Sequence, residues 1–180
     1  MRIIKEQTAG LIIDIQEKLI SHIYKYELIS SHTALLIRGL RLLDIPLILT
    51  QQYTRGLGET IPSIIEVIGN ITPVEKISFS CCDEPGFMKK LSQLGKKNII
   101  IAGIEAHVCV LQTVLDLLDN AYLPVVVENC ISSRKNRDKK IAVERMRQEG
   151  AVVTTYESIL FELTRFAGTD VFKQISKIVK

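Results

Sequence analysis

The amino-acid sequence predicts an α/β protein in which helices cover both faces of a doubly wound, six-stranded parallel sheet, giving three layers of the Rossmann-like kind. The first observation is that short apolar runs alternate along the chain with longer segments whose apolar residues recur at helical spacing. The second is that the short runs are apolar throughout, which is typical of strands buried on both faces by helices. At 180 residues, the chain fits one domain with a substantial core.

Six short apolar runs are predicted as strands, and the first of them ends in an acidic residue. The predicted strands are Thr8–Ile15, Pro46–Thr50, Thr72–Lys76, Asn98–Ala102, Pro124–Val127 and Ala151–Thr154. The polar, glycine-containing stretch Gln51–Thr60 is predicted as a loop.

Helices are predicted between the strands, where apolar residues recur every three or four positions. Pro62 marks the first turn of one helix, and Gly95 and Gly150 mark the ends of two others. The predicted helices are Glu17–Leu43 with a break near Tyr24–Leu28, Ile61–Ile68, Pro85–Leu94, a segment through Val108, Leu111, Leu115 and Leu118, then Asp138–Gln148, Ser158–Phe166 and Val171–Val179. In the first of these, Leu35, Leu36, Leu40 and Leu43 are expected to face the core.

Composition and charge favour an ordinary folded protein over a nucleic-acid-binding or membrane protein. The chain is 47% hydrophobic and 24% charged, with a net charge of +3. The one basic cluster, Arg134–Lys140, has no interleaved aromatic residues that could stack on bases, so it is predicted as a solvated loop and helix start. The apolar run near the N-terminus is short and is interrupted by Asp14, which is unlike a signal peptide or a membrane span.

The four cysteines fit a reducing compartment. Their spacing is not that of metal ligands, and Cys81 and Cys82 are adjacent and poorly placed to pair with each other. We therefore expect a cytoplasmic protein.

Cys109 is the candidate nucleophile. It lies in the stretch GIEAHVCV (Gly103–Val110), which follows the fourth predicted strand and begins a helix. Unpaired N–H groups and the helix dipole favour an anion at this position, so the thiol is expected to ionise more readily than a free cysteine. The alternative is that Cys109 is only a small buried apolar residue.

Two charged residues are predicted to join Cys109, because ligands of open α/β sheets bind at the carboxyl ends of the strands. Asp14 ends the first strand and Lys76 ends the third. A carboxylate next to a thiol in a partly desolvated cleft has a raised pKa and can accept the thiol proton, while the lysine supplies positive charge. Taken singly, each residue also fits a plainer role, with Asp14 capping the next helix and Lys76 on a solvated rim.

Histidine is a poorer candidate base. His107 is only two positions from Cys109 on the same helix start, and residues so spaced do not face each other. His22 and His32 lie in or beside the first helical region, with no sign in the sequence that they reach the carboxyl edge of the sheet. A Cys–His dyad is therefore not expected.

Four motifs resemble a known family. They are LIIDIQ (Leu11–Gln16), TQQYTRGLG (Thr50–Gly58), EKISFS (Glu75–Ser80) and GIEAHVCVLQT (Gly103–Thr113). Together they resemble the isochorismatase-like cysteine hydrolases, which include nicotinamidases, N-carbamoylsarcosine amidohydrolases and isochorismatases. The sequences of the motifs are most similar to those of the small isochorismatase domain-containing proteins. The resemblance covers nearly the whole chain and implies a single domain of the isochorismatase-like hydrolase fold over residues 1–180.

The resemblance assigns roles to the candidate residues. It implies Asp14 as base, Lys76 as its partner and Cys109 as nucleophile. It also implies a cis peptide bond between Ile104 and Glu105, and an oxyanion hole formed by the N–H groups of Glu105 and Cys109. Within the motifs, the residues predicted to bind the substrate are Gln16, Gln52 and Phe79.

Departures from relatives narrow the predicted activity. Nicotinamidases carry an Asp-x-His metal motif after the second strand, where this chain reads QQYTRGLG, so neither a metal nor another cofactor is predicted. The loop also lacks the Lys-Ser/Thr of a phosphate-binding loop, and no G-x-G-x-x-G follows the first strand. A cysteine nucleophile favours covalent acyl transfer over vinyl-ether hydrolysis.

The predicted function is therefore a metal-free cysteine hydrolase acting on a small amide or related C–N bond. Isochorismatase-type hydrolysis and a binding or scaffold protein without turnover remain open as alternatives. A small-molecule substrate is expected as partner, with no nucleic acid or membrane. A homo-oligomer, dimer or tetramer, is also expected, because family members usually associate and the mean hydropathy is high at +0.20.

Overall fold

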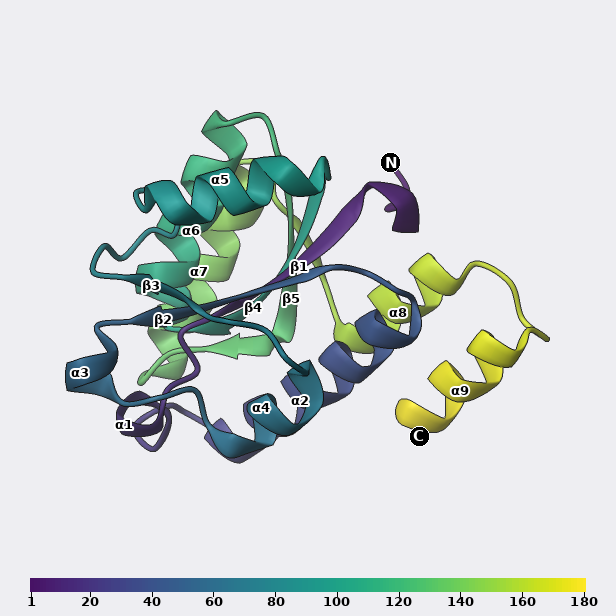
Figure 1. The fold of residues 1–180 in the computed structure, drawn as a ribbon, viewed down its shortest axis with the longest axis horizontal. Coiled ribbons are helices and arrows are strands. Elements are labelled where there is room, and N and C mark those ends of the chain that lie inside the picture. The colour runs from purple at the N-terminus through teal and green to yellow at the C-terminus, as the bar shows by residue number, and fades with distance from the viewer.

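The computed structural model describes all 180 residues and confirms the predicted α/β architecture (Figure 1). All six strands run parallel in one sheet, in the order β3-β2-β1-β4-β5-β6. The strands are β1 Thr8–Ile13, β2 Leu47–Gln52, β3 Val74–Lys76, β4 Asn98–Ile104, β5 Leu123–Ser132 and β6 Val152–Thr154. The order reverses between β1 and β4, which is where a doubly wound sheet opens a crevice at its carboxyl edge.

Nine α-helices connect and cover the strands. They are α1 Glu17–Ile20, α2 Tyr26–Leu42, α3 Thr54–Leu57, α4 Pro62–Ile68, α5 Pro85–Leu94, α6 Leu111–Asp119, α7 Asn136–Gln148, α8 Tyr156–Thr164 and α9 Asp170–Ile178. A 3₁₀ turn at Lys5–Gln7 precedes β1, and a π-helical turn at Ala106–Val110 joins β4 to α6.

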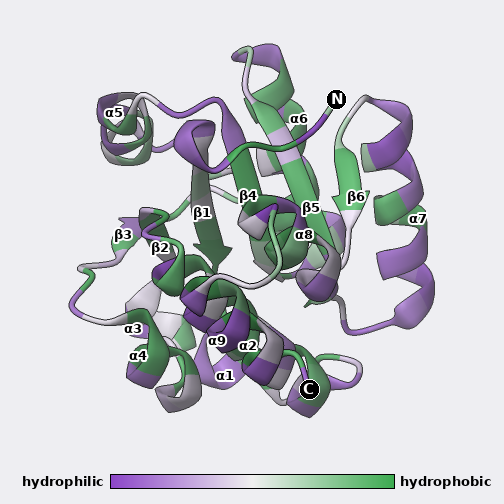
Figure 2. Ribbon diagram, turned by 90° about the vertical axis from the view of Figure 1, so that its right-hand side faces the viewer, coloured by the Kyte–Doolittle hydropathy of each residue, from purple (hydrophilic) through white to green (hydrophobic).

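The sheet separates two hydrophobic cores, and this explains why its strands are apolar throughout. Successive strand residues alternate between the two sides. Ile12 of β1 joins the core under α2, α4, α8 and α9, whereas its neighbours Leu11 and Ile13 join the core under α5, α6 and α7. Figure 2 shows the hydrophobic strands β1, β4, β5 and β6 inside, with α7 largely hydrophilic along its length.

Helical spacing alone did not identify the buried face of every helix. Leu36, Leu40 and Leu43 are buried as predicted, but Leu35 is partly exposed. The helix predicted through Val108, Leu111, Leu115 and Leu118 leaves all four of these residues partly exposed. Its fully buried apolar residues are instead Val110, Val114 and Leu117. Both segments are apolar on more than one stripe, and only packing against the sheet selects between the stripes.

Three strands extend farther than predicted. The strand predicted at Asn98–Ala102 continues to Ile104, and the other two end in buried polar residues. Gln51 and Gln52 belong to β2 rather than to the following loop, which contains the short helix α3. The strand predicted at Pro124–Val127 continues to Ser132, after its register against β4 shifts. The first helical region breaks between Ile20 and Tyr26, close to the predicted position.

Gly103 permits the close approach of β4 to β1 beside the crevice. Its φ of 143° is in a region that L side chains rarely adopt, and a Cβ atom there would lie 2.2 Å from the carbonyl oxygen of Ile13. Asp14, the residue that follows Ile13 at the end of β1, has a φ of 52°. The Ile104–Glu105 peptide bond is cis, as the resemblance implied.

No helix in the structure has the length and apolar character needed to cross a membrane.

Candidate active site

Asp14 and Lys76 form a buried ion pair at the carboxyl edge of the sheet. The Lys76 Nζ lies 2.5 Å from the Asp14 Oδ2, and both side chains are 0% exposed. β1 delivers the carboxylate and β3 delivers the ammonium group, so the two side chains meet across the end of β2. The sequence prediction that these strand ends converge is correct, and the alternative of a solvated Lys76 is wrong.

Neighbouring groups occupy every N–H donor of the Lys76 ammonium group and bind the Asp14 carboxylate as well. The Lys76 ammonium group also donates to the carbonyl oxygens of Ser78 and Phe79, each at 3.1 Å. With Asp14, these carbonyls account for its three N–H donors. The Thr50 hydroxyl donates to the other carboxylate oxygen, Asp14 Oδ1, at 2.7 Å. The carboxylate is therefore held in one orientation by β2 and β3.

Burial raises the pKa of Asp14 above its ordinary value, and the Lys76 charge and the hydrogen bonds to the carboxylate only partly oppose that effect. Burial is the largest single influence on Lys76 and would lower its pKa, but the charge and hydrogen bond of Asp14, together with the nearby Cys109 and Cys81 thiols, raise that pKa overall. Lys76 therefore remains an ammonium group, while Asp14 becomes a stronger base than an exposed carboxylate.

Cys109 lies on the π-helical turn before α6 and is 4% exposed. The expectation that its thiol ionises readily is wrong for this structure. Burial raises the thiol pKa, and the negative charge of Asp14 raises it further, while Lys76 opposes the shift. Desolvation outweighs the helix N-terminus because this thiol has little contact with water. The resting group is a neutral thiol that needs a base.

Gln52 is a hydrogen-bond partner of that thiol. The Cys109 Sγ donates to the Gln52 Oε1 at 3.6 Å, and the Gln52 Nε2 donates to the carbonyl oxygen of Ile77 at 3.1 Å. Gln16 fixes Gln52 from behind, since its amide accepts from the Gln52 N–H at 2.8 Å and donates to the Gln52 carbonyl oxygen at 3.0 Å. Gln16 also donates to the carbonyl oxygen of Gly58 at 2.7 Å.

A network of side chains holds the segment that follows Gln52. Gln51 donates to the Glu59 carboxylate at 3.0 Å and to the Thr54 hydroxyl at 2.9 Å. The Glu75 carboxylate accepts from the backbone N–H and the hydroxyl of Thr54. Glu75 precedes Lys76, so the network ties the β2–α3 segment to the strand that supplies the ammonium group.

Glu105 and His107 point their side chains toward the end of β5 rather than toward the thiol. The Glu105 carboxylate accepts from the backbone N–H of Arg134 at 3.0 Å and from its Nε at 3.1 Å. The His107 Nδ1 lies 2.8 Å from the Ser133 hydroxyl. The Nδ1 of His32 contacts the carbonyl oxygen of Asn129. The expectation that no histidine pairs with Cys109 agrees with these contacts.

Comparison with known proteins gives the family. The isochorismatase domain model matches residues 8–158, which include Asp14, Lys76 and Cys109. The chain belongs to the isochorismatase family.

Its relatives in this family span almost its whole length. The isochorismatase family protein 1B of Dictyostelium discoideum is 41% identical over 99% of this chain and 89% of its own. The MAR1 ribonuclease of Caenorhabditis elegans superposes with a TM-score of 0.93 at 37% identity, covering 99% and 92% of the two chains. YcaC of Pseudomonas aeruginosa, solved with hexane-2,5-diol and covalent acrylamide, has a TM-score of 0.92 at 25% identity, covering 98% and 91%.

In this isochorismatase-family chain, sequence reasoning missed two residues beside the ion pair. Thr50 could have been found, because it ends the predicted strand Pro46–Thr50, which lies next to β1. Cys81 could not, because it belongs to an irregular segment after β3. Its fully buried thiol lies 3.9 Å from the Thr50 hydroxyl, and burial raises its pKa to about 12.

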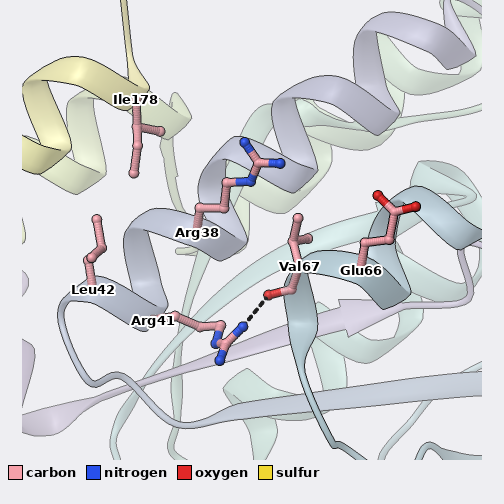
Figure 3. Close-up of a pocket in the computed structure, with 6 residues that line it drawn as sticks. All are labelled: Arg38, Arg41, Leu42, Glu66, Val67 and Ile178. Atoms are coloured by element: carbon pink, nitrogen blue, oxygen red, sulfur yellow. Dashed lines mark hydrogen bonds between the residues drawn. The ribbon is translucent and has the colours of Figure 1, made fainter.

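The larger cavities are not lined by Asp14, Lys76 or Cys109. One of about 620 Å³ opens between α2, α4 and α9, where Arg41 donates to the carbonyl oxygen of Val67 at 2.9 Å (Figure 3). Another, of about 350 Å³, is lined by Leu19, His22, Ile23, Glu105 and Arg134, and so adjoins the cis peptide. No group of three or more His, Cys, Asp or Glu side chains is gathered where it could hold a metal ion.

Proposed function

We propose that this isochorismatase-family chain is a cysteine hydrolase that cleaves a small amide or related C–N bond through a thioester on Cys109. The observation that carries the proposal is the buried Asp14–Lys76 pair beside a neutral, buried thiol. A carboxylate with a raised pKa next to such a thiol is suited to accept its proton.

The first step moves one proton and forms one bond. Asp14 accepts the Cys109 proton, and the thiolate then provides the negative charge that faces Lys76. The sulfur attacks the carbonyl carbon of the substrate, and the carbonyl electrons move onto oxygen. We place that oxygen at the N–H groups of Glu105 and Cys109, at the start of the helical segment, where backbone donors stabilise developing negative charge.

The second half reverses the proton transfer. The tetrahedral intermediate collapses, the C–N bond breaks, and protonated Asp14 gives its proton to the departing ammonia or amine. A water molecule then attacks the thioester, with Asp14 again as base, and releases the carboxylic acid and the Cys109 thiol. Lys76 remains protonated throughout, because its pKa is raised.

The three predicted substrate-binding residues take different roles in this proposal. Gln52 contacts the Cys109 thiol, so its amide is placed to orient the bound carbonyl group. Gln16 is fully buried and bonded to the Gln52 backbone, which suits a positioning residue. The Phe79 carbonyl oxygen accepts from Lys76, while the Phe79 side chain is 53% exposed. This suits a side chain at the mouth of the site.

A relative supports a reactive centre of this kind. Covalent acrylamide in YcaC of Pseudomonas aeruginosa is a small primary amide bonded to a protein of the same fold. The ribonuclease name of the Caenorhabditis elegans relative raises RNA cleavage as a second candidate. The site favours the amide, because the only ammonium group at the triad is already saturated by protein acceptors and is not free for a phosphate.

The test is to incubate the protein with a panel of small primary amides, quench with acid and locate the acyl adduct by peptide mass spectrometry. We expect an acyl mass on Cys109, ammonia release, and loss of both in Cys109→Ser. Cys130→Ser serves as the matched control, since Cys130 is buried in β5 away from the triad. Turnover that survives in Cys109→Ser would support isochorismatase-type hydrolysis, and no turnover with firm capture of a partner protein would support a binding role.

The proposal extends to the cellular setting. All four cysteines are free thiols, which suits the reducing cytoplasm. We also propose that the protein is a homo-oligomer, because large apolar side chains such as Ile77 and Ile141 are more than half exposed.

A further inference from the structure

We propose that the site selects an uncharged substrate and rejects carboxylates and phosphates, and that the body of this substrate is small and apolar. The inference rests on the proposed cysteine hydrolase function and specifies its substrate class. It follows from how the charges around Cys109 are already paired.

Lys76 is the cation closest to Cys109, yet none of its N–H donors is free for a substrate anion. Its ammonium group has three N–H donors, and Asp14, the Ser78 carbonyl and the Phe79 carbonyl accept one each. Binding a substrate carboxylate would require one of these contacts to break inside a site that excludes water. Breaking a buried charge-assisted contact is costly, and so is burying an unpaired anion.

The remaining cations on the segments that build the site do not compensate. Arg134 is paired with Glu105, and its guanidinium group lies on a side chain that is 64% exposed. Arg55 is exposed on α3, where water screens its charge. His107 faces the Ser133 hydroxyl, and His22 faces the cavity lined by Glu105 and Arg134.

Acidic groups outnumber the cations on the same segments. They are Asp14, Glu59, Glu75 and Glu105. Glu59 and Glu75 accept hydrogen bonds within the network that follows Gln52, and Glu105 adjoins the oxyanion position proposed above. Since Asp14 is paired with Lys76 and Glu105 with Arg134, an anion approaching Cys109 would find no unpaired cation beside the thiol, whereas a neutral amide needs none.

Apolar side chains are exposed on the segment that follows Lys76. After Lys76, the chain exposes Ile77 at 71% and Phe79 at 53%, and the backbone between them contacts the Lys76 and Gln52 side chains. A short aliphatic or aromatic group attached to the carbonyl would complement these side chains. The dicarboxylate of a vinyl-ether substrate and the backbone of RNA would not.

Alkylation with iodoacetamide and iodoacetate tests the inference, because the reagents have nearly the same size and differ in charge. The second-order rate at Cys109 is measured for each by peptide mass spectrometry, and their ratio is divided by the ratio for free glutathione. We expect the normalised ratio to favour iodoacetamide at least about tenfold, because an unpaired anion is disfavoured at a desolvated site.

The outcomes separate the two proposals. A normalised ratio near one, or a preference for iodoacetate, overturns the neutral-substrate inference while leaving Cys109 as nucleophile. Failure of both reagents to label Cys109 before they label Cys82 overturns the nucleophile assignment and the inference together. The folded Cys109→Ser variant is treated in parallel, and any label that it carries is alkylation of the other three cysteines.

Discussion

Replacing Lys76 by methionine tests whether the Asp14–Lys76 pair is as tightly coupled as its geometry implies. Methionine keeps the unbranched shape but removes the charge and three hydrogen-bond donors. The Asp14 carboxylate would then remain buried with the Thr50 hydroxyl as its neutral partner. Breaking one partner of a buried ion pair costs about 3–5 kcal/mol, so we expect a loss of that size in the free energy of unfolding near pH 7.

The loss should depend on pH in a definite direction. Without Lys76, the folded-state pKa of Asp14 rises further above its unfolded value, because burial is then opposed only by the hydrogen bonds from Thr50 and Cys109. A raised folded pKa gives stability that is present below the unfolded pKa and is lost as pH rises through the folded pKa. Lys76→Met should therefore come closer to the wild type as pH falls toward 4.

The assay is urea unfolding followed by circular dichroism at several pH values and one fixed protein concentration. The Asp14→Asn/Lys76→Met double variant should recover much of the stability, because no charge is then left buried. Lys173→Met is the matched control, since Lys173 pairs with Asp170 on an exposed face of α9 and should change stability by less than about 1 kcal/mol. A Lys76→Met variant within 1 kcal/mol of wild type at pH 7, as in the control, would refute the coupled pair.

Three further predictions follow from the site. Cys109 should be alkylated faster than Cys82 at neutral pH, although Cys82 is more exposed. The Asp14→Asn variant should lower the alkylation rate of Cys109 alone, and an equal decrease for both thiols would contradict Asp14 as a local base. The value of kcat/KM on any accepted amide should fall as pH drops through the raised pKa of Asp14, above the ordinary value of 3.8, whereas a constant kcat/KM down to pH 4 would argue against a carboxylate base. Light scattering at micromolar concentration should give at least the mass of a dimer, twice 20.3 kDa, and a monomer would remove the proposed assembly.

The sequence was sufficient for the sheet and for the meeting of Asp14 with Lys76, because both depend on regular patterns. Continuous apolar runs indicated strands buried on both faces, and parallel strands bring residues such as Asp14 and Lys76 to one edge. The sequence motif led to the prediction that Gln52 binds the substrate, but it did not predict the contact of Gln52 with the Cys109 thiol. That contact depends on how far β2 continues before the chain turns.

Burial explains what sequence reasoning could not provide. The helix N-terminus at Cys109 predicted a more acidic thiol, but the size of the opposing desolvation depends on how Gln52, Asp14 and Cys81 enclose the sulfur. The buried stripe of α2 was ambiguous for a similar reason, since Leu35 and Leu36 are equally apolar. The ion pair between Glu105 and Arg134 was also not predicted, because the two residues are distant in sequence and belong to no shared motif.

The central claim is that Asp14, and not a histidine, activates Cys109. Its most direct test is the turnover rate of Asp14→Asn and His107→Ala on one substrate that the wild type accepts, with circular dichroism to establish folding. Asp14→Asn keeps the shape of the side chain but cannot accept the proton, so its rate should fall by roughly 10²–10⁴-fold, the usual contribution of a general base. His107→Ala should retain most of the activity, because its imidazole faces Ser133. An active Asp14→Asn enzyme together with an inactive His107→Ala enzyme would contradict the account.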